Sequence, residues 1–381
     1  MGCETKSMKI LELCLSPDFG GLELYMRDFS IWLNNRKDLS LHLVLRVNSR
    51  LADALKDLNV PTLYFRKTLP WLPLLPARQL ARFIEENQID IVHVHWKDDL
   101  IVTALAKKMS DHPFVFTHTR QMMVPGKKRD PYHWFIYRTL DRFIAITKQI
   151  EQQARENLHL PAQKIAQIYY GVRPATKLTP ERIKQIRQAY GIGSNFTVGL
   201  MGRIDWYKAQ YLLIEAMAIL KNKSIDVDGV IVGHAMNENY LVELKQRAFK
   251  AGVSDRLRFI DFTDKPHELM QCFDVLILTT HVETFGLVLV EAMSLGIPVI
   301  GSNAGGVLEI IDHEKTGLLF KTKNAGSLAD AIARMALDPE LRRRLAKAGS
   351  EKAKREYDTD QQHQKVLSLM IETAKRSHGE V

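Results

Sequence analysis

The sequence contains few cysteines and no long apolar run. Its three cysteines, Cys3, Cys14 and Cys272, are too few and too scattered for a disulfide framework or a zinc site, which fits a reducing compartment. No unbroken apolar stretch reaches the roughly 18 residues that a membrane-spanning helix needs. We therefore expect a cytoplasmic protein that, where it meets a membrane, lies on the inner face of the cytoplasmic membrane rather than across it.

The start of the chain lacks the usual targeting signals. Residues 1–7, which precede the first apolar run at Met8, show no basic-then-apolar pattern of a signal peptide. Lys6 stands where a myristoylation pattern requires Ser or Thr. We interpret residues 1–7 as a leader or an appended segment.

The composition is ordinary except for its positive charge. Charged residues make up 25% and hydrophobic residues 46%, which excludes a disordered or collagen-like chain. The formal net charge of +9 favours an anionic partner, which leaves a nucleotide, a nucleic acid or an acidic lipid as candidates. Because no helix-turn-helix, zinc-finger or RNA-binding signature is present, we expect no nucleic acid partner.

Short apolar runs alternate with amphipathic segments, and the length of 381 residues predicts two domains. The runs lie at 10–15, 41–47, 89–95, 114–119 and 142–146, and then at 197–201, 228–232, 257–260, 275–278, 298–301 and 317–320. Apolar strands separated by helices indicate parallel sheets covered on both faces, so the predicted class is α/β in each half. The Pro- and Gly-containing stretch 171–194 separates the halves.

In parallel sheets, ligands bind beyond the carboxyl ends of the strands. In the first half, Gly20 and Gly21 follow the first strand, and two glycines at such a turn allow a ligand to approach the backbone. His118 stands at the exit of another strand and is a candidate ligand contact. His93 and His95 alternate on one strand, but no carboxylate or cysteine accompanies them at ligand spacing, so we predict buried, hydrogen-bonded histidines and no metal site.

The second half opens with a strand-to-helix turn that contains Gly202, Arg203 and Lys208. Arginine offers a forked set of donors and lysine a point charge, a combination suited to a diphosphate. We therefore predict that Arg203 and Lys208 act on a phosphate-containing ligand.

Two glutamates eight positions apart, Glu283 and Glu291, follow the strand at 275–278. Glu291 stands in an otherwise apolar helix, where a carboxylate is costly unless it is paired or holds a polar ligand. Eight residues of helix span about 12 Å, which is comparable to the separation of sugar and ribose across a nucleoside diphosphate sugar. Gly286 at the start of the helix leaves backbone N–H groups open to phosphate.

With these motifs, the chain resembles glycosyltransferase family 4, the retaining nucleotide-sugar glycosyltransferases with two Rossmann-like domains. The most specific element is the pair Glu283 and Glu291 with Phe285-Gly286 between them. The further matches are Gly20-Gly21, His118, Gly202-Arg203, Lys208, Gly305-Gly306 and Gly317, and the stretch 133–142 is similar to bacterial members that build lipopolysaccharide and other surface glycans.

The resemblance implies a GT-B fold, in which two Rossmann-like domains face each other across a cleft. The implied domains are an acceptor-binding domain at 8–175 and a nucleotide-sugar-binding domain at 185–355. A helical tail at 356–381 would pack back toward the first domain.

The resemblance also implies a role for each matching residue. Arg203 and Lys208 would neutralise the leaving diphosphate in place of a metal ion, and Glu291 would accept hydrogen bonds from the ribose. Glu283 would hold the transferred sugar, and His118 would contact that sugar beside its anomeric carbon. The implied catalytic residues are Glu283, His118, Lys208 and Arg203, and the implied donor-binding residues are Gly20, Gly21, Gly202, Arg203, Lys208, Glu283, Phe285, Gly286, Leu287 and Glu291.

The chain departs from the family pattern at a few positions. Ala209 follows Lys208 where glycine is common, Ala235 replaces a usual glycine, and Tyr170 stands where asparagine is frequent. The nucleotide therefore stays open between UDP, which we favour, and GDP, and the sugar between a hexose and an N-acetylhexosamine. No cofactor or metal is expected besides the donor.

The expected acceptor is lipid-linked or an oligosaccharide. Lys67, Arg78 and Arg82 flank the apolar stretch 71–75, and the basic residues 127–129 precede Tyr132, Trp134 and Phe135. Basic residues beside exposed aromatic ones suit an anionic membrane surface. The alternative interpretation is a helix that packs in the core and carries solvated charges.

Three other functions fit parts of the sequence. A sugar-nucleotide epimerase shares the two-domain plan but lacks the paired glutamates, a nucleic-acid-binding protein would use only the positive charge, and an inactive adaptor would not need Glu283, Lys208 and Arg203. The sequence therefore predicts a retaining, metal-independent glycosyltransferase, with the epimerase as the alternative.

Overall fold

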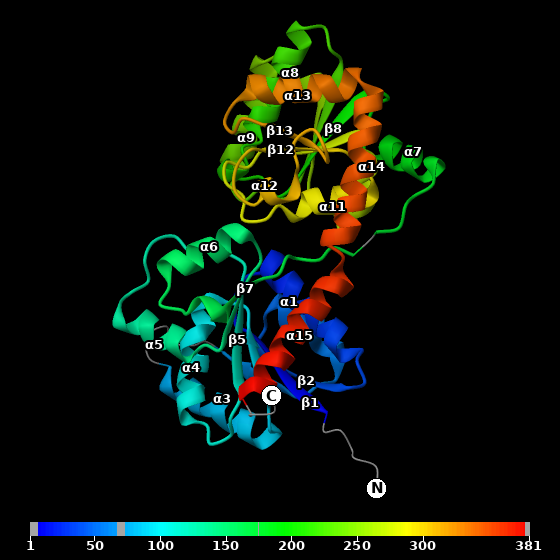
Figure 1. The fold of residues 1–381 in the computed structure, drawn as a ribbon. Helices are drawn as coiled ribbons and strands as arrows, with labels where there is room; N and C mark the ends of the chain where they lie inside the picture. Colours follow the sequence, from blue (N-terminus) through cyan, green and yellow to red (C-terminus); the bar gives the residue numbers. More distant parts are fainter. Residues whose placement is uncertain (1–6, 67–72, 174, 378–381) are drawn as a thin grey trace. The chain divides into compact units, whose positions relative to one another are not determined.

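The computed structural model describes residues 7–66, 73–173 and 175–377, which form two compact units (Figure 1). The N-terminal unit contains the described residues up to Tyr169 together with those from Gln361 onward, and the C-terminal unit contains Tyr170–Asp360. The chain passes into the C-terminal unit about six residues before the expected end of the first domain at 175. Each unit is a parallel sheet with helices on both faces, so the predicted pair of Rossmann-like domains is confirmed.

The N-terminal unit is built on a seven-stranded sheet in the order β3-β2-β1-β4-β5-β6-β7. Its strands are β1 (Met8–Cys14), β2 (Leu39–Arg46), β3 (Thr62–Phe65), β4 (Ile91–Val94), β5 (Val115–Arg120), β6 (Arg142–Ala145) and β7 (Ile165–Gln167). Its helices are α1 (Gly21–Asn34), α2 (Arg50–Leu55), α3 (Leu74–Asn87), α4 (Leu100–Met109), α5 (Pro131–Thr139) and α6 (Lys148–Asn157).

Two strands of this sheet were not predicted. The edge strands β3 and β7 have four and three residues, and most of their side chains are only partly buried. A short, half-exposed edge strand does not need the continuous apolar run by which the other strands are recognised.

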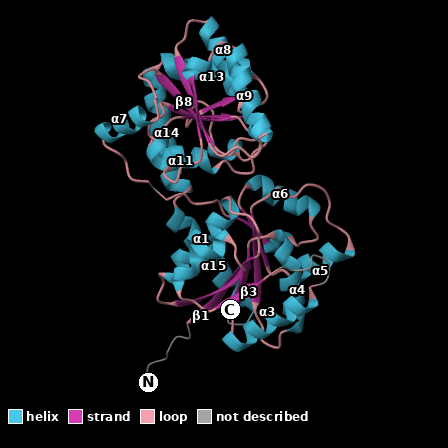
Figure 2. Cartoon of the chain, turned by 180° about the vertical axis from the view of Figure 1, so that it is seen from behind, coloured by secondary structure: helices cyan, strands magenta, loops and turns pink. Residues whose placement is uncertain are grey.

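The C-terminal unit has a six-stranded sheet in the order β10-β9-β8-β11-β12-β13. Figure 2 shows the strands of this sheet among the surrounding helices. Its strands are β8 (Phe196–Met201), β9 (Val227–Val232), β10 (Leu257–Ile260), β11 (Val275–Leu278), β12 (Val299–Ser302) and β13 (Leu318–Phe320). Its helices are α7 (Pro180–Ala189), α8 (Tyr211–Asn222), α9 (Glu238–Lys250), α10 (Pro266–Met270), α11 (Leu287–Leu295), α12 (Val307–Ile310), α13 (Ala325–Leu337) and α14 (Pro339–Glu356). Because all six strands are parallel, the turns that follow β8, β9 and β11 meet at one edge of the sheet.

The last helix, α15 (Thr359–Ser377), packs on the N-terminal unit from Gln361 onward, beside α1 (Figure 1). The buried ring of His363 contacts the rings of Phe29 and Trp32 on α1, at centroid distances of 4.9 Å and 5.4 Å. The Arg142 guanidinium at the start of β6 donates to the Thr373 hydroxyl at 3.1 Å. The expected return of the C-terminal helix to the first domain is therefore confirmed.

The packing of α15 predicts a cost for removing one of its buried side chains. Leu367 is fully buried, so we expect Leu367→Ala to lower the free energy of unfolding by about 2–5 kcal/mol, measured by urea denaturation of the full chain. The exposed Lys365 on the same helix gives the control, because Lys365→Ala should change stability by no more than about 0.5 kcal/mol. Equal losses in the two variants would contradict this role of α15.

Candidate active site

The turn after β8 carries the predicted diphosphate-binding residues. Gly202 has φ +148°, and after it a 3₁₀ turn, Trp206–Lys208, is capped by Asp205, whose carboxylate accepts from the Tyr207 N–H at 2.8 Å. Ala209, which replaces a common glycine, still adopts the left-handed φ of +52° and is fully buried. The backbone at this position therefore keeps the conformation that explains the preference for glycine.

Lys208 and Glu283 form an ion pair in the C-terminal unit. The Lys208 Nζ lies 2.7 Å from Oε2 of Glu283, and their side chains are 26% and 17% exposed. The Thr279 hydroxyl at the end of β11 donates to the Lys208 carbonyl at 2.7 Å, which ties the turn after β8 to the turn after β11. The two charged groups thus meet at the carboxyl edge of the sheet, where the sequence placed the ligand.

The loop that carries Glu283 rests on the glycine pair Gly305 and Gly306. The Gly306 N–H donates to the Glu283 carbonyl at 2.8 Å. A Cβ on Gly305 would lie 2.2 Å from the Glu283 carbonyl oxygen, and a Cβ on Gly306 would lie 2.3 Å from that of Thr284. No other residue fits at such distances, so the glycine pair fixes the position of the Glu283 loop.

The helix that follows Glu283 starts later than expected. Gly286, with φ +100°, is the N-cap of α11, and the helix begins at Leu287. Residues 283–286 form a turn, so the expectation that eight residues of helix separate Glu283 from Glu291 is wrong. Glycine is favoured at this left-handed position. As at any helix start, the first N–H groups of α11, those of Leu287 and Val288, have no carbonyl partner within the helix. A helix start of this kind, with no acidic residue in its first turn, favours an anion.

Glu291, the carboxylate inside the apolar helix α11, has an ionic partner that the sequence did not indicate. His267 on α10 places its Nε2 atom 3.5 Å from Oε1 of Glu291. The Glu291 carboxylate raises the pKa of His267, and this effect outweighs the burial of the ring, which lowers it. A carboxylate in an apolar helix needs a partner or a polar ligand, so a partner for Glu291 was one of the two expectations. The sequence could not identify His267 as that partner, because it lies 24 positions earlier and no local pattern connects the two residues.

The other predicted residues of the C-terminal unit differ in how exposed their side chains are. The Arg203 side chain is exposed on the turn after β8, Leu287 is half-buried, and Phe285 is buried against the rings of Tyr170 and Tyr357. Phe285 therefore packs in the core of the unit, and only its backbone is available to a ligand.

His118 lies in the N-terminal unit, within β5 rather than after it. Its Nδ1 atom is 2.9 Å from the Val94 carbonyl oxygen, which can only accept, so Nδ1 carries the hydrogen. Burial, with Arg120 nearby, lowers the pKa of His118 well below its usual value, which keeps the ring neutral. The buried Nε2 atom is thus an acceptor, and it has no hydrogen-bond partner among the residues that the structure describes. A ligand hydroxyl would satisfy it.

Gly20 and Gly21 stand at the start of α1. The Gly20 N–H donates to Oε2 of the buried Glu23 at 2.7 Å, which closes the first turn of the helix. A Cβ on Gly21 would meet no atom within 4 Å. Within the N-terminal unit, the space above Gly21 is open to a ligand.

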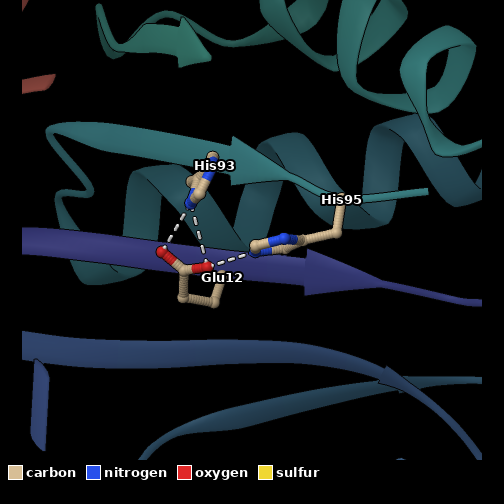
Figure 3. A group of neighbouring side chains, drawn as sticks. All are labelled: Glu12, His93 and His95. Atoms are coloured by element: carbon tan, nitrogen blue, oxygen red, sulfur yellow. Dashed lines mark hydrogen bonds and ion pairs between the residues drawn. The ribbon is translucent and has the colours of Figure 1, made fainter. Parts of the chain in front are cut away.

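His93 and His95 are buried and hydrogen-bonded, as predicted, but a carboxylate does accompany them (Figure 3). Glu12 on β1 lies opposite His93 of β4 in the sheet, and both of its oxygens are 3.0 Å from the His93 Nδ1. The His95 Nε2 is 2.5 Å from Oε2 of Glu12, and the His93 Nε2 is 2.7 Å from the Thr119 hydroxyl. The expectation that no carboxylate stands beside these histidines is wrong, because pairing between strands brings in a residue 81 positions away.

Glu12, His93 and His95 have the donor atoms of a metal site, since one ligand atom from each lies within 4.8 Å of the others. Burial alone would raise the pKa of Glu12, but the two imidazoles outweigh it and lower the pKa to about 2. Burial lowers the pKa of His95 to about 4. The cluster is therefore a carboxylate that accepts hydrogen bonds from two imidazole N–H groups, and in this arrangement its donor atoms already satisfy one another.

The two parallel-sheet units define a two-domain α/β protein of the Rossmann-like class, and the second unit has an ion pair and a helix N-terminus at its strand ends. Two family models match the chain in succession: "Glycosyltransferase Family 4" over residues 19–176 and "Glycosyl transferases group 1" over residues 182–352. The chain belongs to the GT4-like glycosyltransferases of the GT-B fold. Both models describe glycosyltransferases, so the epimerase alternative has no support.

Known proteins agree with this assignment. The crystal structure of Anabaena Alr3699/HepE in complex with UDP has a TM-score of 0.85 at 24% identity, over 96% of this chain and 100% of that one. The N-acetyl-alpha-D-glucosaminyl L-malate synthase of Bacillus anthracis is 24% identical over 319 residues, which cover 79% of this chain and 81% of the relative. The uncharacterized glycosyltransferase MJ1607 of Methanocaldococcus jannaschii is 29% identical over 57% of this chain and 56% of the relative.

The glycine pair under Glu283 predicts a steric effect. A Cβ at Gly306 would displace the Thr284 carbonyl, so we expect Gly306→Ala to destabilise the protein by about 1–3 kcal/mol in thermal unfolding. Gly326 in α13 is the matched control, because a Cβ there would lie 3.4 Å from its nearest neighbour and should be tolerated. Equal behaviour of the two variants would contradict the close approach.

Proposed function

We propose that the protein is a retaining glycosyltransferase that moves a hexose or N-acetylhexosamine from a nucleoside diphosphate sugar to a lipid-linked or glycan acceptor, in bacterial surface polysaccharide or lipopolysaccharide synthesis. The observation that carries the proposal is the Lys208–Glu283 ion pair beside the N-terminus of α11. It combines a cation for the diphosphate, a carboxylate for sugar hydroxyls and amide donors for phosphate oxygens.

The donor would lie along the carboxyl edge of the C-terminal sheet. Lys208, Arg203 and the first N–H groups of α11 bind the diphosphate, Glu283 accepts from the sugar hydroxyls, and Glu291 accepts from the ribose. UDP is the favoured nucleotide and GDP the second choice. The likeness in fold to HepE, which was solved with UDP, supports this order.

The reaction separates charge, and the site opposes that cost with fixed cations and dipoles. The bond between the anomeric carbon and the diphosphate oxygen breaks, and its electron pair stays on the diphosphate. The acceptor oxygen bonds to the carbon on the same face and gives its proton to the departing oxygen. Lys208, Arg203 and the helix amides stabilise the growing negative charge, each charged hydrogen bond contributing about 1.5–3 kcal/mol. These groups occupy the place that a metal ion takes in other transferases.

The N-terminal unit would supply contacts to sugar hydroxyls and to the acceptor. The neutral His118 Nε2 accepts a hydrogen bond from a sugar hydroxyl, and the open space above Gly21 admits a bulky ligand. Neither group carries charge, so the role that we propose for them is positioning rather than proton transfer.

We further propose that the N-terminal unit docks on an anionic membrane surface. Tyr132 and Trp134 on α5 are 40% and 44% exposed, and the basic residues 127–129 precede them. Arg78 and Arg82 on α3 are exposed near Leu75, whereas Lys67, Trp71 and Leu72 lie outside the described residues. None of the helices that the structure describes is long and apolar enough to cross a bilayer.

The docking is tested by measuring how the full chain binds to anionic vesicles at low and at high salt. Binding that is lost at high salt supports the docking, and binding that does not change with salt would contradict it.

Removing either member of the ion pair should stop transfer. We expect Lys208→Ala and Glu283→Gln each to lower kcat at least about 100-fold, because each removes a fixed charge from the reacting groups. Transfer is measured with the nucleotide sugar that raises the melting temperature most in a thermal-shift screen. Lys223→Ala, which removes the exposed lysine paired with Asp330, is the control and should keep full activity. Full activity in either site variant would refute the proposed site.

Transfer should also survive a chelator. If Lys208, Arg203 and the amides of α11 replace a metal ion at the diphosphate, then excess EDTA leaves the rate of transfer unchanged and added Mg²⁺ or Mn²⁺ does not raise it. The rates are measured with the same donor in the presence and absence of each reagent. A rate that EDTA abolishes and Mg²⁺ restores would contradict the metal-independent mechanism.

A further inference from the structure

His267 on α10 lies against Glu291 on α11. The His267 Nε2 atom is inaccessible to solvent and makes no hydrogen bond within the described chain, yet it faces Oε1 of Glu291 at 3.5 Å. The side chains are 40% and 23% exposed, so the rest of the pair borders on solvent. A small rotation of either side chain closes this gap to a charged hydrogen bond.

Among the described residues, Glu291 is the acidic group that pairs with His267. Helix α10 packs against α7 and α11, and Glu291 is the charged residue of α11. Arg182 of α7 pairs with Glu268 at 3.0 Å, and Lys265 lies 3.6 Å from the same carboxylate. Arg182 and Lys265 are thus engaged with Glu268, and Glu291 is the ionic partner of the ring.

We propose that His267 is a positioning residue that holds the Glu291 carboxylate so that it accepts hydrogen bonds from the ribose of the donor nucleotide. This inference rests on the proposed function, in which Glu291 binds the ribose. A glutamate on a helix surface has three rotatable bonds and loses their freedom when it binds a ligand. An imidazole that fixes one oxygen beforehand reduces that loss and leaves the other oxygen for the ribose.

The protonation of His267 should make nucleotide binding through the ribose depend on pH. Because the Glu291 carboxylate raises the pKa of His267, the ring keeps its charge to a higher pH than an ordinary histidine, whose value is about 6.5. The charged pair exists below the raised pKa and is lost as the pH rises through it. The ribose contribution to binding should therefore fall with rising pH in the wild type and stay constant in a variant without His267.

The test compares nucleotides that differ only at the ribose. Binding of UDP and GDP, and of their 2′-deoxy and 3′-deoxy forms, is measured by calorimetry with the full chain, for the wild type, His267→Leu and Glu291→Gln. We expect the wild type to favour the ribonucleotide about tenfold or more, and His267→Leu to reduce that preference at least about threefold while it leaves the affinity for the deoxynucleotide unchanged. Arg182→Leu, on the other side of α10, is the control and should keep the full preference.

Each other outcome overturns a definite part of the account. If neither UDP nor GDP binds the wild type, the proposed donor site fails and this inference fails with it. If nucleotides bind and Glu291→Gln keeps the ribose preference, Glu291 does not contact the ribose. If only Glu291→Gln loses the preference, or if His267→Leu weakens all nucleotides equally, His267 has no positioning role and the proposed function stands without it.

Discussion

The ion pair between Lys208 and Glu283 is the interaction on which the proposed donor site depends. Charged side chains at the edge of a sheet usually extend into solvent. Here the backbone that carries each of the two charged residues is held by a hydrogen bond. Thr279 holds the Lys208 carbonyl, and Gly306 holds that of Glu283. A donor that binds here, as we propose, would meet a cation and a carboxylate that are already oriented, which lowers the entropy lost on binding.

The same constraint explains why the C-terminal unit contains so many glycines at its strand ends. Gly202, Gly286 and Gly305 all have positive φ, and Gly305 and Gly306 lie under the Glu283 loop at distances that no Cβ permits. In the N-terminal unit, by contrast, polar side chains are buried beneath the helices. His118 is neutral, and the ionised Glu12 carboxylate accepts hydrogen bonds from His93 and His95.

The sequence predicted the strands that are built from apolar runs and the residues that directly follow them. It did not predict contacts between residues that are far apart in the sequence. The central strands follow from runs of buried residues, whereas the short edge strands β3 and β7 lack such runs. Lys208 and Glu283 were both predicted because each follows a strand, and parallel strands end at a common edge. The sequence did not predict two contacts. Glu12 meets His93 through the register of the sheet, and His267 meets Glu291 through the packing of two helices. No spacing in the sequence indicates either contact.

Amide hydrogen exchange of the full chain, with and without saturating UDP or GDP, tests the central claim most directly. If the Lys208–Glu283 region binds the diphosphate, the nucleotide slows exchange in residues 202–209 and 283–291 while the amides of β10, at the edge of the same sheet, stay unchanged. Protection confined to other segments, with these two unchanged, would contradict the account.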